Sequence, residues 1–338
     1  MKIDIFVDIV EGELLNTPFI SAFENVRVNP NAVKRGDLFI ANDISQVHTA
    51  VQNGAYCILL EQDMDIIDAE IAWVKVPNMT NAIRKLTNIE FVDNNNTFVL
   101  AGELEFKLLS LMTTDKKNII LLSGNLLDDM QYFFEHKENH IFLSSSEEYI
   151  KFFRTTFRLS YSDSLEYSIV QENLLDTSLL YKNETYNHLK IPSIFIDALC
   201  KVMDFLDKYK LSYSLQHLSH FEHFQVCFVD NSCELQEYGK SEKLLIFERE
   251  NSFVQREIEH IFKQAPWLRK LFLLPRNMDI DINDDNTEVI YFENKEQIIE
   301  ALQSKPFHLA YIAHDKQSIL NSLGKKTMQQ NLFSISET

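Results

Sequence analysis

Short apolar runs alternate with segments of helical period in the last third of the chain, and this alternation restricts the fold more than any other feature. Strands are expected at 243–247, 270–274, 289–292 and 308–313, and helices at 253–262, 295–303 and 317–323. Parallel strands that are joined by helices form one sheet with helices on both faces. The pattern therefore predicts a small doubly wound, Rossmann-like domain at the C-terminal end.

The same kind of alternation occurs twice earlier in the chain. Before residue 90 the sequence predicts strands at 36–40 and 56–60 and helices at 47–53 and 81–86. After a polar turn the alternation begins again, with strands at 98–100 and 118–122 and a helix at 103–112. We therefore predict an α/β protein, and a length of 338 residues is enough for two or three domains.

The chain carries 50 acidic and 32 basic residues, a net charge of −18. Such a charge repels nucleic acid and anionic lipid surfaces, so neither is an expected partner. No run of about 18 apolar residues is present, and acidic residues interrupt the apolar positions of residues 1–14, which argues against membrane insertion and a signal peptide. We expect a cytoplasmic protein whose four cysteines remain reduced.

Glycine is scarce in this sequence. Seven glycines are present, where an average usage of about 7% would give roughly 24. A backbone that approaches a phosphate closely, or that adopts positive φ, normally uses glycine at that point. The composition therefore disfavours nucleotide chemistry.

The segment 26–61 contains the run GDLFIA at 36–41 and the pair Gly54-Ala55, and a second distinctive segment, YFENKE, begins at Tyr291. These segments resemble the Mur ligases, cytoplasmic ATP-dependent enzymes that add amino acids to the peptidoglycan precursor. Within that family they are most similar to the MurF branch, which adds D-alanyl-D-alanine. The resemblance implies a three-domain architecture. A UDP-sugar-binding domain would occupy 1–90, a truncated central ATPase domain 91–215, and a Rossmann-like domain 216–338.

The family's substrate-binding motifs are largely replaced in this sequence. Its uridine-side motif Asp-Ser-Arg falls on Asn29 to Asn31, which lack both the acid and the cation. Its Asp-Gly-His loop is shortened, so that only His48 matches. Its Asp-Asp-Ser-Tyr-Asn motif is met in part by Asp230 and Ser232. The resemblance therefore implies that Asn29, Asn31, His48, Asp230 and Ser232 are remnants of a substrate site.

The family's ATP motif, Thr-Gly-x-x-Gly-Lys-Thr/Ser, falls on the segment 123–129, which reads SGNLLDD. Ser123, Gly124 and the following Asn125 keep the start of a phosphate loop, but Asp128 replaces the lysine and Asp129 replaces the hydroxyl that holds magnesium. A helix N-terminus favours negative charge by about 0.3–1 kcal/mol, so the two aspartates are predicted to take the place of a phosphate. Like charges at about 4 Å repel by about 1–4 kcal/mol. We therefore predict no ATP or magnesium as cofactor.

Three histidines at a spacing of three, His217, His220 and His223, form the densest set of soft metal ligands, with Cys227 and Cys233 nearby. Zinc accepts such donors, but its sites have specific ligand spacings, and the cysteines lack a CxxC spacing. We therefore interpret the histidines as structural or surface residues and predict no metal.

These observations lead to one main hypothesis and two alternatives. The main hypothesis is a non-catalytic Mur ligase-like protein that acts as a scaffold or regulator in peptidoglycan precursor synthesis or cell-shape control, with proteins of that machinery as partners. The first alternative is a divergent ATP-dependent UDP-MurNAc-peptide ligase, with a cation supplied by Lys116, Lys117 or Arg154. The second alternative is a sensor of a muropeptide or a nucleotide sugar.

Overall fold

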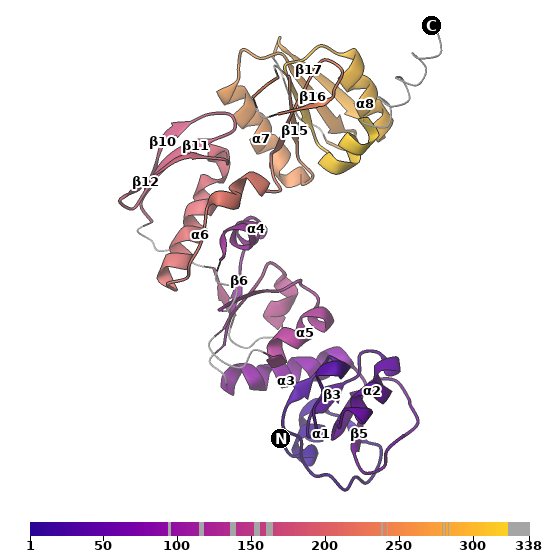
Figure 1. The fold of residues 1–338 in the computed structure, drawn as a ribbon. Coiled ribbons are helices and arrows are strands. Elements are labelled where there is room, and N and C mark those ends of the chain that lie inside the picture. The colour runs from indigo at the N-terminus through magenta and orange to yellow at the C-terminus, as the bar shows by residue number, and fades with distance from the viewer. Residues whose placement is uncertain are drawn as a thin grey trace. The chain divides into compact units, whose positions relative to one another are not determined.

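The computed structural model describes most of the chain in two compact units (Figure 1). The described residues are 1–93, 96–114, 118–135, 140–151, 156–159, 165–237, 239–241, 243–278, 280, 282 and 284–323. Unit 1 contains Met1–Asp163 and Lys201–Ser214, and unit 2 contains Ser164–Cys200 and Leu215–Thr338. Helix α6 (Ile196–Lys208) passes from unit 2 into unit 1.

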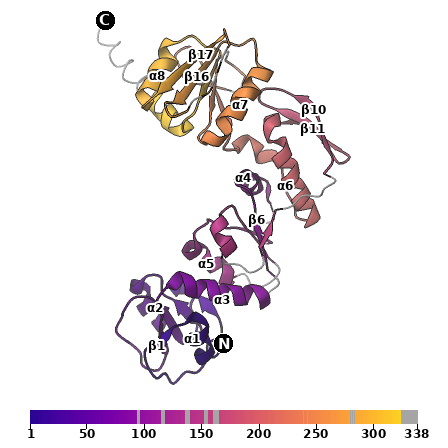
Figure 2. The ribbon, with the colours of Figure 1, turned by 180° about the vertical axis from the view of Figure 1, so that it is seen from behind.

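Unit 1 begins with a five-stranded sheet of order β1-β5-β4-β3-β2. Its strands are β1 (Glu13–Leu14), β2 (Val26–Arg27), β3 (Leu38–Ile40), β4 (Cys57–Leu60) and β5 (Ala72–Lys75), with β1 antiparallel and the rest parallel. Its helices are α1 (Ile3–Val10), α2 (Val47–Gln52) and α3 (Met79–Asp93). Alternate residues of β3 point to opposite faces, so Leu38 and Ile40 enter one core and Phe39 the other. Both faces of this sheet are therefore covered (Figure 2).

A four-stranded parallel sheet of order β7-β8-β6-β9 completes unit 1. Its elements are β6 (Thr97–Leu100), α4 (Glu103–Met112), β7 (Ile119–Leu121), α5 (Leu126–Glu135), β8 (Ile141–Ser144), the 3₁₀ helix η3 (Glu147–Lys151) and β9 (Thr156–Arg158). Phe98, Phe133 and Phe142 belong to the same apolar core as Ile83 and Leu86 of α3. One continuous core therefore joins the two sheets of unit 1.

Unit 2 begins with a three-stranded antiparallel sheet of order β10-β11-β12. Its strands are β10 (Tyr167–Glu172), β11 (Thr177–Tyr181) and β12 (Glu184–Leu189). Two 3₁₀ helices follow, η4 (Ser193–Phe195) before α6 and η5 (Gln216–His220) after it. The sheet therefore leads into η4 and α6, and η5 precedes the large C-terminal sheet.

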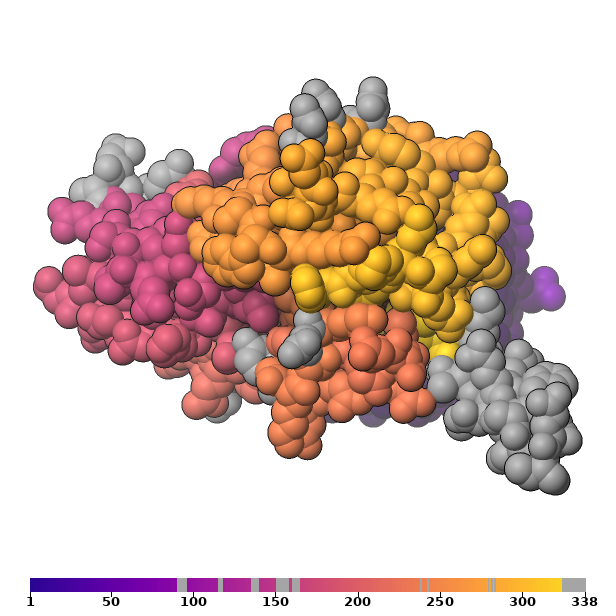
Figure 3. All heavy atoms as spheres, turned by 90° about the horizontal axis from the view of Figure 1, so that it is seen from above, coloured from indigo at the N-terminus to yellow at the C-terminus, as the bar shows by residue number. Residues whose placement is uncertain are grey.

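The C-terminal part of unit 2 is a six-stranded sheet of order β14-β13-β15-β18-β16-β17. Its elements are β13 (Gln225–Val229), β14 (Leu235–Gln236), β15 (Lys243–Phe247), α7 (Asn251–Gln264), β16 (Lys270–Pro275), β17 (Thr287–Phe292), α8 (Lys295–Ser304) and β18 (Leu309–Ile312), and residues 316–323 are helical. The four strands from β15 onward are parallel, and β13 and β14 are antiparallel. Helices α7 and α8 lie on opposite faces of this sheet (Figure 1). In Figure 3 the atoms of this part of the chain, coloured orange to yellow, pack closely against one another. The doubly wound domain predicted here is confirmed.

The boundary predicted at residue 90 falls within α3, and the segment 164–200 of the predicted middle domain lies in unit 2. The three-domain division at 90 and 215 stays a prediction. Among the described residues, no helix is long and apolar enough to cross a membrane.

Candidate functional site

The loop between β7 and α5 holds its own anion. In the first turn of α5, Asp129 turns its side chain back toward the loop, where Oδ1 accepts the Ser123 N–H over 2.9 Å and Oδ2 accepts the Gly124 N–H over 3.1 Å. Asp129 is 1% exposed. Backbone N–H groups in such a turn are the donors that bind a phosphate in nucleotide-binding proteins. Here the Asp129 carboxylate occupies them.

The other polar groups of this loop also pair within the loop. Ser123 Oγ accepts the Asn125 N–H over 3.1 Å, and Asn125 Oδ1 accepts the Leu127 N–H over 3.0 Å. Gly124 has φ +93°, a left-handed conformation that glycine adopts without strain, and a Cβ there would lie 3.4 Å from Ser146 Cβ. The loop is therefore a closed turn with its donors satisfied.

Tyr149 in η3 closes the site from the other side. Its hydroxyl donates to Asp129 Oδ2 over 2.5 Å, and its ring packs against Phe98 and Phe133. Burial raises the pKa of Tyr149, and the hydrogen bond to Asp129 raises it further. The neighbouring Asp128 is exposed. Of the two aspartates predicted to replace a phosphate, only Asp129 therefore occupies the loop.

The predicted uridine-side residues have local roles in the structure. Asn29 Oδ1 accepts the Asn31 N–H over 3.0 Å and thereby caps the 3₁₀ helix η1 (Pro30–Ala32). Asn31 and His48, the latter on α2, are exposed. Asn29 therefore organises its own turn.

Asp37 was missed as a site residue, although it belongs to the matched run GDLFIA. It is 1% exposed and accepts hydrogen bonds from Asn25 Nδ2 over 3.0 Å, Arg27 Nε over 3.1 Å and the Lys34 N–H over 3.0 Å. These donors come from β2 and from the two segments that flank it. Asp37 therefore ties the start of β3 to β2 and to the turn that follows η1.

Asp230 closes the turn between β13 and β14. Its Oδ1 accepts the Ser232 N–H over 2.8 Å and the Glu234 N–H over 3.0 Å, and its Oδ2 accepts a hydrogen bond from Gln236 Nε2 over 3.0 Å. Asp230 and Ser232 thus meet in a hairpin turn, through the Ser232 backbone.

The three histidines lie in two different environments. His217 and His220 lie in η5, exposed, with ring centroids 6.0 Å apart. His223 is buried, and its Nδ1 lies 3.1 Å from both carboxylate oxygens of Glu248. Over the described part of the chain, no group of three His, Cys, Asp or Glu side chains is placed to hold a metal. Burial raises the pKa of the Cys227 thiol to about 11 and raises that of Cys233 as well.

A buried polar network around Glu248, at the end of β15, was also missed. Glu248 accepts the N–H groups of Phe224 over 3.2 Å and Glu250 over 2.7 Å. Burial works to raise the pKa of the Glu248 carboxyl, but the His223 hydrogen bond and the other donors outweigh it, so that its pKa lies below the ordinary value. Glu257 of α7 is buried nearby and accepts the Tyr311 hydroxyl over 2.6 Å.

Glu257 differs from Glu248 in its expected protonation. Burial raises the pKa of the Glu257 carboxyl well above its ordinary value, and the charge of Glu248 adds to this effect. Burial raises the pKa of Tyr311, and the neighbouring Glu257 and Glu248 raise it further. The pair therefore combines a Glu248 whose surroundings favour the charged form and a Glu257 whose surroundings favour the neutral form. Only the position of Glu248 directly after the apolar run KLLIF could have indicated this network in the sequence.

The two units together define an α/β protein with the Mur ligase fold. The chain matches a crystal structure of MurF from Acinetobacter baumannii with a TM-score of 0.51 and 10% identity, over 97% of this chain and 98% of that chain. It also matches the MurF ligase from Thermotoga maritima in complex with ADP, with a TM-score of 0.50 and 12% identity, over 91% of this chain and 98% of that chain. No family model matches the sequence, and no curated protein is significantly similar to it. These likenesses show the fold.

Proposed function

We propose that this chain is a non-catalytic protein with the Mur ligase fold, which acts as a scaffold or regulator in peptidoglycan precursor synthesis or cell-shape control. Its partners would be proteins of that machinery. The observation that carries the proposal is the Asp129 carboxylate, which holds the Ser123 and Gly124 N–H groups of the ATP-motif loop. The resemblance of the fold to MurF supports the link to peptidoglycan synthesis.

A nucleotide phosphate would have to displace Asp129 from this loop. Each hydrogen bond to a charged group contributes about 1.5–3 kcal/mol, and Asp129 accepts from Ser123, Gly124 and Tyr149. The arriving phosphate would then face the Asp128 and Asp129 carboxylates, at about 1–4 kcal/mol for each close pair of charges. Lys116, Lys117 and Arg154, the cations of the alternative ligase hypothesis, lie outside the described residues.

Calorimetric titration of the full chain with MgATP tests whether the chain binds the nucleotide. An ADP-release assay that supplies a UDP-MurNAc-tripeptide and D-alanyl-D-alanine tests whether it catalyses the ligase reaction. We expect no saturable binding of MgATP up to about 1 mM, which corresponds to a binding free energy less favourable than about −4 kcal/mol. Micromolar affinity, or ADP release that depends on both substrates, would overturn the proposal.

A variant that rebuilds the family's loop serves as the matched comparison. The triple change Leu127→Gly, Asp128→Lys and Asp129→Thr returns the second glycine, the cation and the hydroxyl to the segment 123–129. If the acidic loop is what prevents binding, this variant gains at least about tenfold in affinity for inorganic pyrophosphate over the parent chain. Circular dichroism of both proteins checks that the variant is folded.

The partner half of the proposal needs a separate test. Cross-linking of the tagged chain in its native cells, followed by mass spectrometry, is expected to enrich enzymes of peptidoglycan precursor synthesis or proteins that set cell shape. Enrichment of neither group, relative to an unrelated tagged protein expressed at the same level, would overturn this half.

A further inference from the structure

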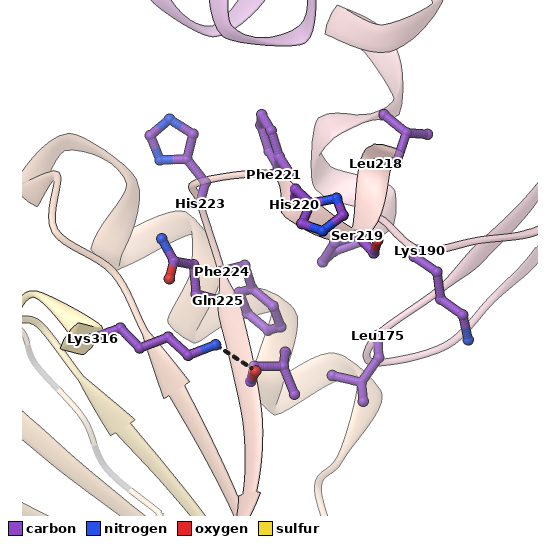
Figure 4. Close-up of a pocket in the computed structure, with 12 residues that line it drawn as sticks. Leu175, Lys190, Leu218, Ser219, His220, Phe221, His223, Phe224, Gln225 and Lys316 are labelled. Atoms are coloured by element: carbon purple, nitrogen blue, oxygen red, sulfur yellow. Dashed lines mark hydrogen bonds between the residues drawn. The ribbon is translucent and has the colours of Figure 1, made fainter. Parts of the chain in front are cut away.

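Unit 2 contains a cavity of about 440 Å³ in front of the start of β13 (Figure 4). Its walls come from η5, from the β10–β11 turn, from the segment after β12 and from the first residue of the helical segment 316–323. Sites for small molecules in proteins enclose roughly 300–1,000 Å³. The cavity is therefore large enough for a small organic ligand.

The inner wall of this cavity is apolar. Leu218, Phe221 and Phe224 line it and are buried, and Leu175 contributes from the β10–β11 turn. Aromatic walls bury a large apolar area of a bound ligand at a low cost in side-chain entropy. This wall fits the aromatic or aliphatic body of a ligand.

The charged residues that line the cavity are all basic. Lys316 is half-buried and donates from Nζ to the Val226 carbonyl over 2.9 Å, which fixes its ammonium group at the wall. Lys190 and His220 are exposed at the rim, and in Figure 4 Lys190 and Lys316 extend from opposite sides of the Phe224 ring. The lining residues include no aspartate or glutamate, in a chain whose net charge is −18. The side chains that line the cavity therefore present positive charge, while the Glu248 carboxylate lies behind the wall at His223 and Phe224.

Phe224 in this wall has a strained backbone, with φ +50°. A bulky residue in the left-handed region costs about 1–3 kcal/mol and persists only where its surroundings hold it. Here the buried Glu248 accepts the Phe224 N–H over 3.2 Å and also pairs with the ring of His223, the preceding residue. Strain held in this way clusters at binding sites, where it positions side chains in advance.

From the apolar wall, the lysines and the strained Phe224, we propose that this cavity binds a small organic anion. The apolar body of the ligand lies against Phe221 and Phe224, and the positive charges of Lys190 and Lys316 attract its carboxylate or phosphate group. Ammonium groups bind either head group as point charges, so the shared chemistry is an anion joined to an apolar body. The inference does not depend on the loop at Asp129, because no residue of that loop lines the cavity.

Calorimetric titration of the full chain with four probes tests this inference. The probes are 3-phenylpropanoate, phenyl phosphate, the neutral 3-phenylpropanamide and inorganic phosphate. We expect at least one of the two aryl anions to bind at least about tenfold more tightly than both the amide and inorganic phosphate. The tighter of the two aryl anions identifies the head group. No saturable binding of either aryl anion up to about 10 mM, or equal binding of the amide, would overturn the proposal.

Lys190→Glu is the variant that locates the site, because Lys190 is an exposed residue that lines the cavity, and circular dichroism checks that the variant is folded. We expect at least about tenfold weaker binding of the preferred aryl anion. Lys182→Glu is the matched control, since Lys182 is an exposed residue next to β12 of the same small sheet and does not line the cavity. Its affinity is expected to stay within about twofold of the parent chain. Equal losses in the two variants would contradict the site.

Discussion

The Tyr149 hydroxyl donates a hydrogen bond to the Asp129 carboxylate over 2.5 Å, and each of the two residues is 1% exposed. With the Ser123 and Gly124 N–H groups, this carboxylate has three donors, which come from the β7–α5 loop and from η3. The acid thus joins the β7–α5 loop, which falls at the position of the ATP motif in the sequence comparison, to η3. Removing this carboxylate should therefore lower the free energy of unfolding and loosen the β7–α5 loop.

Asp129→Asn is expected to destabilise the chain by about 1–3 kcal/mol, because an amide presents one acceptor oxygen where the carboxylate presents two. The unpaired N–H group would also exchange faster. Urea unfolding measures the first effect, and hydrogen–deuterium exchange of the Ser123 and Gly124 amides measures the second. Asp128→Asn is the control, because Asp128 is exposed, and it should change stability by less than about 0.5 kcal/mol. Equal effects of the two variants would contradict the role assigned to Asp129.

Tyr149→Phe removes the hydroxyl donor and should cost about 1 kcal/mol at neutral pH. Since the pKa of Tyr149 lies above its ordinary value of 10.0, the folded chain favours the neutral phenol. Its contribution is therefore complete below pH 10 and is lost as the pH rises above that value. The stability of Tyr149→Phe should approach that of the parent chain above pH 10, as measured by urea midpoints. A gap that is constant from pH 7 to pH 11 would contradict this assignment.

The periodic parts of the fold were predictable from the sequence. The strand β15 (Lys243–Phe247) and the helix α4 (Glu103–Met112) have the predicted bounds, because a run of apolar residues and a helical stripe each indicate one structure. The helix α1 (Ile3–Val10) was not predicted, since its isoleucines and valines favour strands. It forms because Ile3, Phe6 and Val10 are buried on one face, with the Phe6 ring edge-on to Phe23.

The site residues also differ in how far the sequence alone could predict them. The position of Asp129 in a motif allowed its carboxylate to be predicted in the loop, whereas the geometry that separates it from Asp128 depends on Tyr149, 20 residues away. The pairs in unit 2 were not predictable, because His223 and Glu248 are 25 residues apart and Glu257 and Tyr311 are 54 residues apart. Such contacts depend on strand order, which no local pattern contains.

Asp37→Ala should destabilise unit 1 by about 2–3 kcal/mol. The change leaves the Arg27 side chain and the Lys34 N–H without their acceptor, and the estimate is moderated because the Arg27 side chain is 23% exposed. Asn31→Ala is the control, since Asn31 is exposed and its backbone N–H, which the variant keeps, makes the bond to Asn29. Thermal unfolding of the two variants compares them. A similar loss for Asn31→Ala would mean that the turn, and not Asp37, sets the stability of this region.

Glu257→Gln tests the buried acid pair in unit 2. Because the pKa of Glu257 in the folded chain lies well above its ordinary value of 4.5, its stabilising contribution is complete below that pH. It is lost as the pH rises, since the unfolded chain gains from ionisation that the folded chain resists. Glutamine resembles the protonated acid and can still accept the Tyr311 hydroxyl.

The stability of Glu257→Gln, relative to the parent chain, should therefore increase between pH 4 and pH 8. Urea midpoints at pH 4, 6 and 8 measure this trend. Glu259→Gln, an exposed position on the same helix α7, supplies the matched control and should show no such trend. If the difference between Glu257→Gln and the parent chain does not change with pH, Glu257 is ionised in the fold, and the pairing of a charged Glu248 with a neutral Glu257 is wrong.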